Sequence, residues 1–191
     1  MYIVAGPNGA GKSTLTSRAR HILGLEPIDA DAIQRDTGMS SGDAWAEGLR
    51  RCRQALDDGA SFLVETTLAG RDRTRRSTYL NLMAEAKSRG FRVDLTYIAL
   101  ENADAHVARV ADRVAGGQHD IPESLIRERY ERSRERAVEA MGIADHTLLI
   151  DNSSVTIPFR ELVEIDNRRI VAKSDDVPEW ADEIVWRFLV L

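Results

Sequence analysis

The sequence has little of several features that mark particular classes of protein. It has one cysteine, Cys52, in 191 residues, so no disulfide can form within the chain. Cys52 falls in a helical pattern, which favours a packed core thiol over a reactive one. No apolar run approaches the roughly 20 residues of a membrane-spanning helix. The N-terminus leads directly into an apolar run at residues 2–5 and leaves no space for a signal peptide, so we expect a cytoplasmic protein without membrane contact.

An excess of positive charge is also missing. The chain has 26 Lys and Arg against 31 Asp and Glu, a net charge of −5, which argues against nucleic acid as a partner. Seven arginines nevertheless fall in residues 109–136, where glutamates alternate with them at helical spacing, so most are expected in surface ion pairs. There is no internal repeat or low-complexity segment. A content of 43% hydrophobic residues fits a single domain over residues 1–191.

One stretch near the N-terminus carries a specific chemical signal. Residues 6–14 read Gly-Pro-Asn-Gly-Ala-Gly-Lys-Ser-Thr and match the phosphate-binding pattern G-x-x-x-x-G-K-[ST]. The glycines let backbone N–H groups turn inward, and a following helix adds the positive end of its dipole. The apolar run at residues 2–5 and a helical pattern at residues 13–23 supply the strand and helix that the pattern requires, which argues against a chance match.

The residue types in this phosphate loop (residues 6–13) suit a nucleoside triphosphate with Mg²⁺. Lys12 is expected beside the outer phosphates, and the Ser13 hydroxyl is expected in the coordination shell of the metal. The residues expected to contact the nucleotide here are Asn8, Gly9, Ala10, Gly11, Lys12, Ser13 and Thr14.

Strand and helix patterns alternate through the rest of the chain. Further strands are expected at residues 25–28, 61–64, 91–100 and 146–150, and the main helices between them at residues 43–58, 74–89 and 122–141. Such alternation is typical of a parallel sheet covered by helices on both faces. A hairpin within residues 159–173 and a final helix at residues 178–189 follow. The sequence therefore predicts a three-layer α/β fold around a five-stranded, mainly parallel sheet.

Polar residues follow two of these strands, at the edge where such sheets bind ligands. Asp29 and Asp31 come after the second expected strand, and Asp31 is the stronger candidate for a site acid. Asp31 is also a candidate N-cap of the helix that follows, which is compatible with a catalytic role. The third expected strand is followed by Glu65, Thr67 and Arg71.

Two arginine-bearing helices around a glycine-rich turn occupy residues 109–130. Asn102 is expected to cap the first helix, on which Arg109 and Arg113 share one face. Phosphoryl transfer needs positive charge over the γ-phosphate while water is excluded, so the segment fits a mobile lid. A plain surface hairpin is the open alternative. His119, in the turn, has no second His or Cys at ligand spacing, so no metal site is expected there.

In their order, these motifs resemble the zeta-toxin-like branch of P-loop kinases, which is related to the small-molecule and nucleoside-monophosphate kinases. The resemblance rests on residues 6–14, on Ile-Asp-Ala-Asp at residues 28–31, on Val-Glu-Thr-Thr at residues 64–67 and on the arginine-rich residues 109–130. It extends over most of the chain, through Asn152.

The resemblance implies transfer of the γ-phosphate of ATP or GTP, with Mg²⁺, to a hydroxyl group; zeta toxins act on UDP-N-acetylglucosamine. By motif, Asp31 corresponds to the acid that accepts the proton of the attacking hydroxyl. Glu65 and Thr67 correspond to substrate contacts, with Arg71 close behind them in the sequence. Arg113 corresponds to a lid arginine on the γ-phosphate, so the implied catalytic set is Lys12, Asp31 and Arg113. The resemblance also implies an antitoxin protein as a possible partner. No residue of this sequence identifies that partner.

The lid departs from the family pattern. Residues 116–119 read Gly-Gly-Gln-His in place of an arginine-bearing turn. Arg109 is then a candidate for stacking on adenine, and Arg127 and Arg129 are both candidates for the second lid arginine. Asn152 follows the fifth expected strand, where the family holds the edge of the base.

Two other classes are weighed against the kinase. ABC-type ATPases share the phosphate loop, residues 115–118 resemble part of their signature, and residues 148–151 resemble a Walker B strand. Against this class, Asp151 is followed by Asn152 and not by the glutamate that activates water. In a nucleotide-binding switch without transfer chemistry, Asp31 would only cap a helix. Asp31→Asn would then be harmless, whereas in a kinase it should abolish turnover and leave nucleotide binding intact.

Overall fold

The computed structural model describes residues 1–70, 78–116 and 120–190. The strands in these residues are β1 (Tyr2–Ala5), β2 (Pro27–Ile28), β3 (Leu63–Thr66), β4 (Asp94–Ala99), β5 (His146–Asp151), β6 (Arg160–Asp166) and β7 (Arg169–Lys173). They form one sheet in the order β2-β3-β1-β4-β5-β6-β7. The first five in this order are parallel, as predicted, and β6 and β7 are antiparallel.

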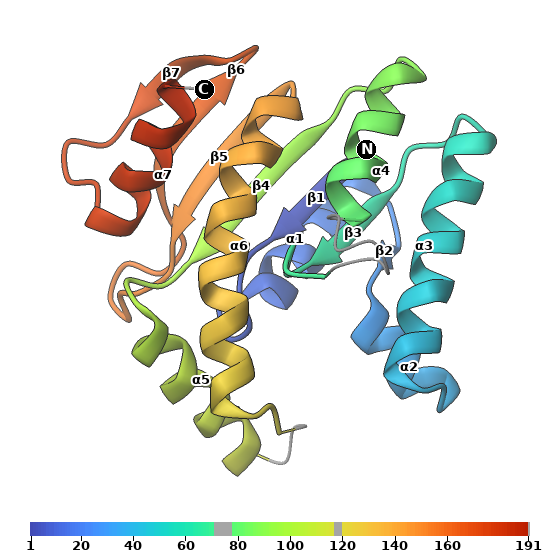
Figure 1. Ribbon diagram of the computed structural model, residues 1–191, viewed down its shortest axis with the longest axis horizontal. Coiled ribbons are helices and arrows are strands. Elements are labelled where there is room, and N and C mark those ends of the chain that lie inside the picture. The colour runs from blue at the N-terminus through green and yellow to red at the C-terminus, as the bar shows by residue number, and fades with distance from the viewer. Residues whose placement is uncertain (71–77, 117–119, 191) are drawn as a thin grey trace.

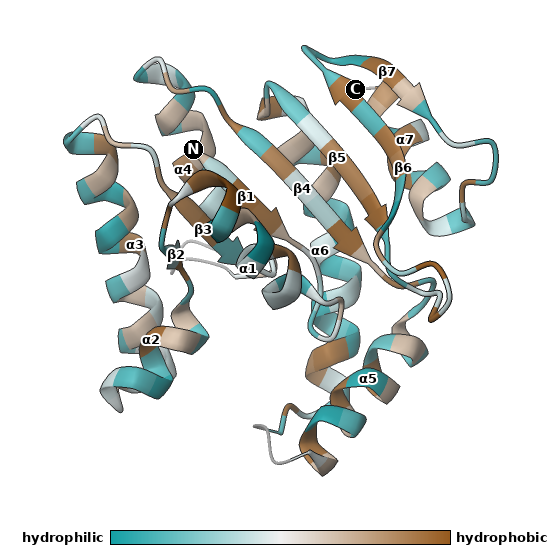
Figure 2. Ribbon diagram, turned by 180° about the vertical axis from the view of Figure 1, so that it is seen from behind, coloured by the Kyte–Doolittle hydropathy of each residue, from teal (hydrophilic) through white to brown (hydrophobic). Residues whose placement is uncertain are grey.

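Helices cover both faces of the sheet, so the three-layer prediction is confirmed. The helices of the described residues are α1 (Lys12–Leu23), α2 (Ala30–Thr37), α3 (Ser41–Asp57), α4 (Thr78–Ser88), α5 (Ala103–Ala115), α6 (Glu123–Ile143) and α7 (Glu179–Leu189). On one face lie α3, α4, α6 and α7 (Figure 1), and α1 lies on the other, over β1 and β3 (Figure 2). No described helix has both the length and the apolar character needed to cross a membrane.

The core lies mainly between the sheet and the larger helical layer. Ile3 and Val64, on neighbouring central strands, are 1% and 0% exposed, and Cys52 on α3 is 0% exposed. Burial raises the pKa of the Cys52 thiol to about 12, which agrees with the predicted packed, unreactive thiol. This packing fixes the central strands and therefore the positions of the loops at their carboxyl ends. There α2 and α5 flank the sheet on opposite sides (Figure 1).

The predicted C-terminal hairpin is present and is continuous with the sheet. β6 pairs with β5 from His146↔Asp166 to Asp151↔Arg160, with one irregularity, and β7 pairs with β6. The sheet therefore has seven strands in the described residues, and the five-stranded parallel part is its core.

Capping residues account for several helix starts. The Asn102 side chain accepts a hydrogen bond from Ala105 N, as predicted for α5. The expected cap of α2 is wrong by two residues: Asp29 is the N-cap, its carboxylate accepts from Asp31 N at 3.0 Å, and Asp31 lies inside the first turn. The helix starts earlier than expected because the Asp29 carboxylate satisfies one of its first free N–H groups.

Candidate active site

The phosphate loop lies between the end of β1 and the start of α1. Gly6 and Gly11 have φ values of 150° and 99°, which favour glycine. A Cβ on Gly6 would lie 1.9 Å from the Ile98 carbonyl oxygen, and one on Gly11 would lie 2.6 Å from Asn152 Nδ2. α1 begins at Lys12, so the free N–H groups of its first turn belong to the loop. The local geometry is that of an anion-binding turn.

Lys12 lies across this loop and is largely buried. Its Nζ donates to the Pro7 carbonyl at 3.0 Å. Burial lowers the pKa of the Lys12 ammonium, while the charges of Glu65 and Asp31 raise it and that of Arg113 lowers it. Lys12, Asp31 and Arg113 were predicted from separate segments, and the structure brings Asp31 and Arg113 within electrostatic reach of Lys12.

Glu65 is held by two hydroxyl groups of α1. Ser13 Oγ donates to Glu65 Oε1 at 3.3 Å, and Thr16 Oγ1 donates to Glu65 Oε2 at 2.8 Å. Glu65 lies within β3, not after it, because it pairs in register with Val4 on β1. The sequence analysis missed Thr16, although its position three residues after Ser13 places it on the same side of the helix.

The two acids after β2 have different surroundings. Asp31 is exposed. Burial lowers the pKa values of Lys12 and Arg129, and the negative charge of Asp31 opposes both shifts. Asp29 is more buried; burial and then the charge of Glu65 raise the pKa of its carboxyl. Asp31 is therefore the accessible carboxylate near two cations, and Asp29 orients the turn that carries it.

Asn152 joins the loop after β5 to the phosphate loop. Its Nδ2 donates to the Ala10 carbonyl at 2.9 Å, and its Oδ1 accepts from Phe159 N at 3.2 Å. Its own carbonyl accepts from Arg109 Nη2 at 2.7 Å. Both ends of the side-chain amide are thus engaged by the protein. In this geometry Asn152 positions the phosphate loop, and Arg109 lies beside it.

His106 on α5 is a buried contact of the phosphate loop that the sequence analysis missed. Its Nε2 accepts from Leu100 N at 3.1 Å, so Nδ1 carries the proton and donates to the Asn8 carbonyl at 2.7 Å. Burial lowers the pKa of His106 to about 4. Its ring lies 5.1 Å from that of Tyr130 on α6. A lone histidine in a helix gives no sequence signal for such a role.

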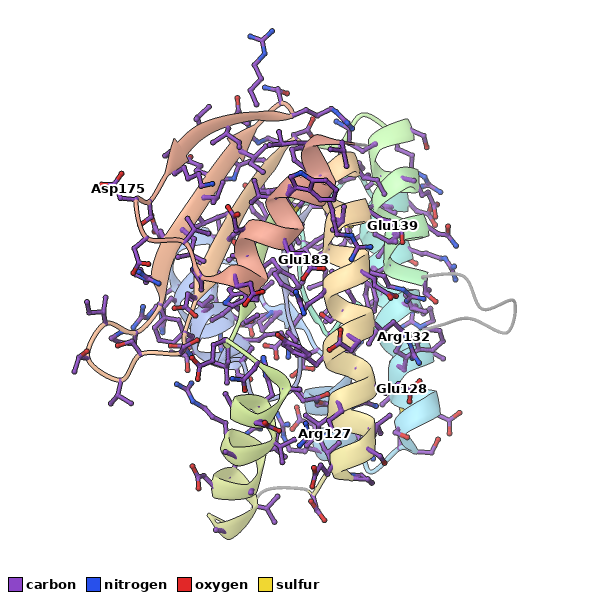
Figure 3. The ribbon with its side chains drawn as sticks, turned by 60° about the vertical axis from the view of Figure 1, so that its left-hand side comes forward. Arg127, Glu128, Arg132, Glu139, Asp175 and Glu183 are labelled. Atoms are coloured by element: carbon purple, nitrogen blue, oxygen red, sulfur yellow. The ribbon has the colours of Figure 1, made fainter. Side chains whose placement is uncertain are left out.

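The structure distinguishes the two candidates for the second lid arginine. Arg127 is exposed and pairs with Asp104 on α5 at 2.6 Å and with Glu123 at 2.8 Å. Figure 3 shows Arg127 on the side of α6 that faces α5. Arg129 Nη1 instead donates to Asn8 Oδ1 at 3.2 Å. Of the two, Arg129 reaches the phosphate loop, and Arg127 links α5 to α6.

Thr67 begins the β3 loop, which we define as residues 67–70. Thr67 is half-buried, and its Oγ1 accepts from Ala69 N at 3.3 Å. Arg71, the next residue after this loop, lies outside the described residues, as do His119 and the second half of the ABC-like segment at residues 115–118.

Comparison with known sequences gives a consistent result. A family model described as zeta toxin matches residues 31–162, which is more than half of the chain. An uncharacterized protein of Haemophilus influenzae is 32% identical over 130 residues, covering 65% of this chain and 88% of that protein. The family match begins at Asp31, so the phosphate loop is an observation independent of it.

Two solved structures have the same fold. A chain from the PezAT chromosomal toxin–antitoxin system of Streptococcus pneumoniae superposes with a TM-score of 0.59 at 17% identity, covering 98% of this chain and 77% of that one. A candidate kinase from Chloroflexus aurantiacus superposes with a TM-score of 0.50 at 20% identity, covering 67% and 75%. At these identities the likeness concerns the fold alone.

Proposed function

The chain belongs to the zeta toxin family, and we propose that it is a phosphotransferase that moves the γ-phosphate of ATP or GTP to a hydroxyl group of a small acceptor. One observation carries this proposal: a phosphate loop, the buried ammonium of Lys12 and the exposed carboxylate of Asp31 meet at one edge of the sheet. In phosphoryl transfer the protein itself performs little covalent chemistry once the phosphate donor and the acceptor hydroxyl are in line. A cradle for the phosphates and a base for the hydroxyl are the essential parts.

We assign to Asp31 the role of the base that accepts the proton of the acceptor hydroxyl. In the transfer step the hydroxyl oxygen bonds to the γ-phosphorus, the bond from that phosphorus to the bridging oxygen of the nucleotide breaks, and the proton passes to the Asp31 carboxylate. Lys12 stabilises the negative charge on the phosphate oxygens. Arg113 and Arg129 add positive charge from the lid, and Arg109 is assigned to the face of the base.

The residues around Ser13 suit Mg²⁺, a cation that prefers oxygen ligands and takes most of them from water and phosphates. Ser13 Oγ would be the protein ligand, and Glu65, which accepts a hydrogen bond from it, would orient it. Bound there, Mg²⁺ would neutralise charge on the phosphates. The Glu65 carboxylate beside the Ser13 hydroxyl adds the negative charge and the oxygen donors that Mg²⁺ prefers.

For the acceptor we propose UDP-N-acetylglucosamine, on the strength of family membership, with Glu65, Thr67 and Arg71 as its contacts. The Streptococcus pneumoniae chain comes from a toxin–antitoxin system, which supports a protein antitoxin as a partner of this chain as well.

The test is phosphate transfer from labelled ATP·Mg²⁺ to a panel of nucleotide sugars, nucleosides and simple sugars, with Asp31→Asn run alongside. We expect label on UDP-N-acetylglucosamine and none with the variant, while the variant binds nucleotide as the wild type does. Label on a different compound would keep the mechanism and change the acceptor. If no acceptor is labelled and phosphate release is the same in both proteins, the phosphotransferase assignment is wrong.

The ABC-type alternative has less support. Asp151, the Walker B candidate, is 4% exposed. Its carboxylate is already engaged, because Oδ1 accepts from Ser153 Oγ at 2.5 Å and Oδ2 pairs with Arg160 at 3.4 Å. An aspartate held in this way stabilises the carboxyl end of β5.

A further inference from the structure

Three arginines on one face of α6 contact two different parts of the site. Arg129, Arg132 and Arg136 are three and four residues apart, the spacing of a single helix face. Arg129 reaches Asn8 in the phosphate loop. The other two reach the β3 loop, which is more than 60 residues away in the sequence.

These contacts satisfy three successive carbonyl groups. Arg136 Nη1 donates to the carbonyls of Leu68 at 2.9 Å and Gly70 at 2.5 Å. Arg132 Nη1 donates to the carbonyl between them, that of Ala69, at 3.0 Å. Arg136 is 8% exposed. Hydrogen bonds from charged, buried donors are stronger than neutral ones and fix the orientation of their acceptors.

The β3 loop has a conformation that needs such support. Leu68 has a φ of 58°, a left-handed backbone that a leucine adopts at a cost, and its side chain is fully buried. The N–H groups of Leu68 and Ala69 are taken by the hydroxyls of Thr66 and Thr67. The carbonyls therefore turn toward α6, and the two arginines are their partners there. Thr67 takes its position from this arrangement.

We propose that Arg132 and Arg136 are positioning residues for the acceptor. They act through the backbone of the β3 loop, which holds Thr67. The proposal rests on the proposed phosphotransferase function. Arg129 lies on the same face of the helix, so α6 donates hydrogen bonds both to Asn8 in the phosphate loop and to the carbonyls of the β3 loop.

Arg134 provides a matched control on the same helix. It lies between the two positioning residues in sequence, but its guanidinium pairs with Glu183 on α7 at 2.5 Å. Figure 3 shows Glu183 on α7 beside α6, and Arg132 on a different side of α6. Arg134 therefore links α6 to α7, and the hydrogen bonds to the β3 loop described above come from Arg132 and Arg136.

The experiment compares Arg132→Gln and Arg136→Lys with Arg134→Lys. Three quantities are measured: the dissociation constant for ATP·Mg²⁺, the kcat and KM for the acceptor that the panel identifies, and amide hydrogen exchange in residues 66–70. We expect the acceptor KM to rise about tenfold or more in both test variants, since a small misplacement of a contact has an effect of this size. In both test variants amide exchange in residues 66–70 should become faster, and the dissociation constant for ATP·Mg²⁺ should stay within about twofold of wild type. The control variant, Arg134→Lys, should change none of the three quantities.

Two results would overturn the proposal. One is an equal loss of nucleotide affinity and acceptor affinity together with lower thermal stability, which is the pattern of general destabilisation. The other is no change in residues 66–70. If wild-type protein labels no acceptor, the proposed function fails, and the exchange measurement still decides whether the arginines hold the β3 loop. Should Arg136→Lys fail to fold, Arg132→Gln, at a less buried position, gives the same comparison.

Discussion

Gly11 shows how closely single atoms define the phosphate loop. A Cβ there would lie 2.6 Å from Asn152 Nδ2, the atom that donates to Ala10 O, at a residue with φ 99°. Gly11→Ala should displace Asn152 and leave a buried polar group unsatisfied, which costs about 1–3 kcal/mol. Since about 1.4 kcal/mol is tenfold in a binding constant, nucleotide affinity should fall about tenfold or more, as measured by titration with a fluorescent ATP analogue.

Gly24→Ala is the control for backbone strain in that experiment. Gly24 caps α1 with a φ of 67°, and a Cβ there would meet nothing within 4 Å. This variant should lose about 1 kcal/mol of stability from the left-handed backbone and keep its nucleotide affinity. Equal nucleotide affinity in the two variants would show that the contact between Gly11 and Asn152 does not shape the binding site.

Among the elements, α5 carries several of the residues assigned to the site. A change at its N-cap tests whether this helix supports nucleotide binding. Asn102 Oδ1 accepts from Ala105 N at 2.9 Å, one residue before His106. Asn102→Ala should cost about 1 kcal/mol of unfolding free energy and loosen the first turn of α5, so that the His106 contact with the phosphate loop weakens. We expect a lower denaturation midpoint and weaker nucleotide binding.

Ser40→Ala is the matched change at the cap of α3. Ser40 Oγ accepts from Asp43 N at 3.2 Å, so the energetic loss should be similar, about 1 kcal/mol. α3 contributes no hydrogen bond to the phosphate loop in the described structure, so nucleotide binding should not change. If both variants weaken nucleotide binding equally, α5 has no special role.

The elements also show what the sequence could predict and why the rest escaped it. The phosphate loop and the cap at Asn102 follow from short local patterns. The five parallel strands follow from apolar runs that alternate with helical patterns, although their pairing partners lie far apart in the sequence. The cap of α2 was misplaced, since Asp29 and Asp31 have the same chemistry and only the hydrogen bond to Asp31 N separates them. The contacts of Arg129 and Arg136 were out of reach, because their partners are 121 and 68 residues away.

Over the whole molecule, the charge distribution differs from the net charge. The chain carries −5, yet the cations assigned to the proposed site, Lys12, Arg113 and Arg129, come from three separate segments. Among the α6 arginines, Arg127 pairs with Glu123 and Arg134 pairs with Glu131. Arg132 pairs with Glu128 and also donates to the Ala69 carbonyl of the β3 loop. The fold thus sorts the arginines of one helix between surface pairs and the site, a division that a count of charges does not reveal.

The burial of His106 makes the stability of the whole molecule depend on pH. His106 contacts the end of β4 and the phosphate loop, and burial, with the charges of Lys12 and Arg109, lowers its pKa from 6.5 to about 4. Between these two values the unfolded chain binds a proton at this position and the folded chain does not, so acid favours unfolding. Above about pH 6.5 both states are neutral here and the contribution is constant.

The measurement is the unfolding free energy of wild type and of His106→Gln by urea denaturation from about pH 7 to about pH 4. Other acids titrate equally in both proteins, so the difference between the two curves isolates His106. The stability advantage of the wild type should shrink by about 3 kcal/mol over this range, because each unit of pKa shift corresponds to about 1.4 kcal/mol. A constant difference would mean that His106 titrates alike in the folded and unfolded chain, and the buried, neutral histidine that holds the phosphate loop would be ruled out.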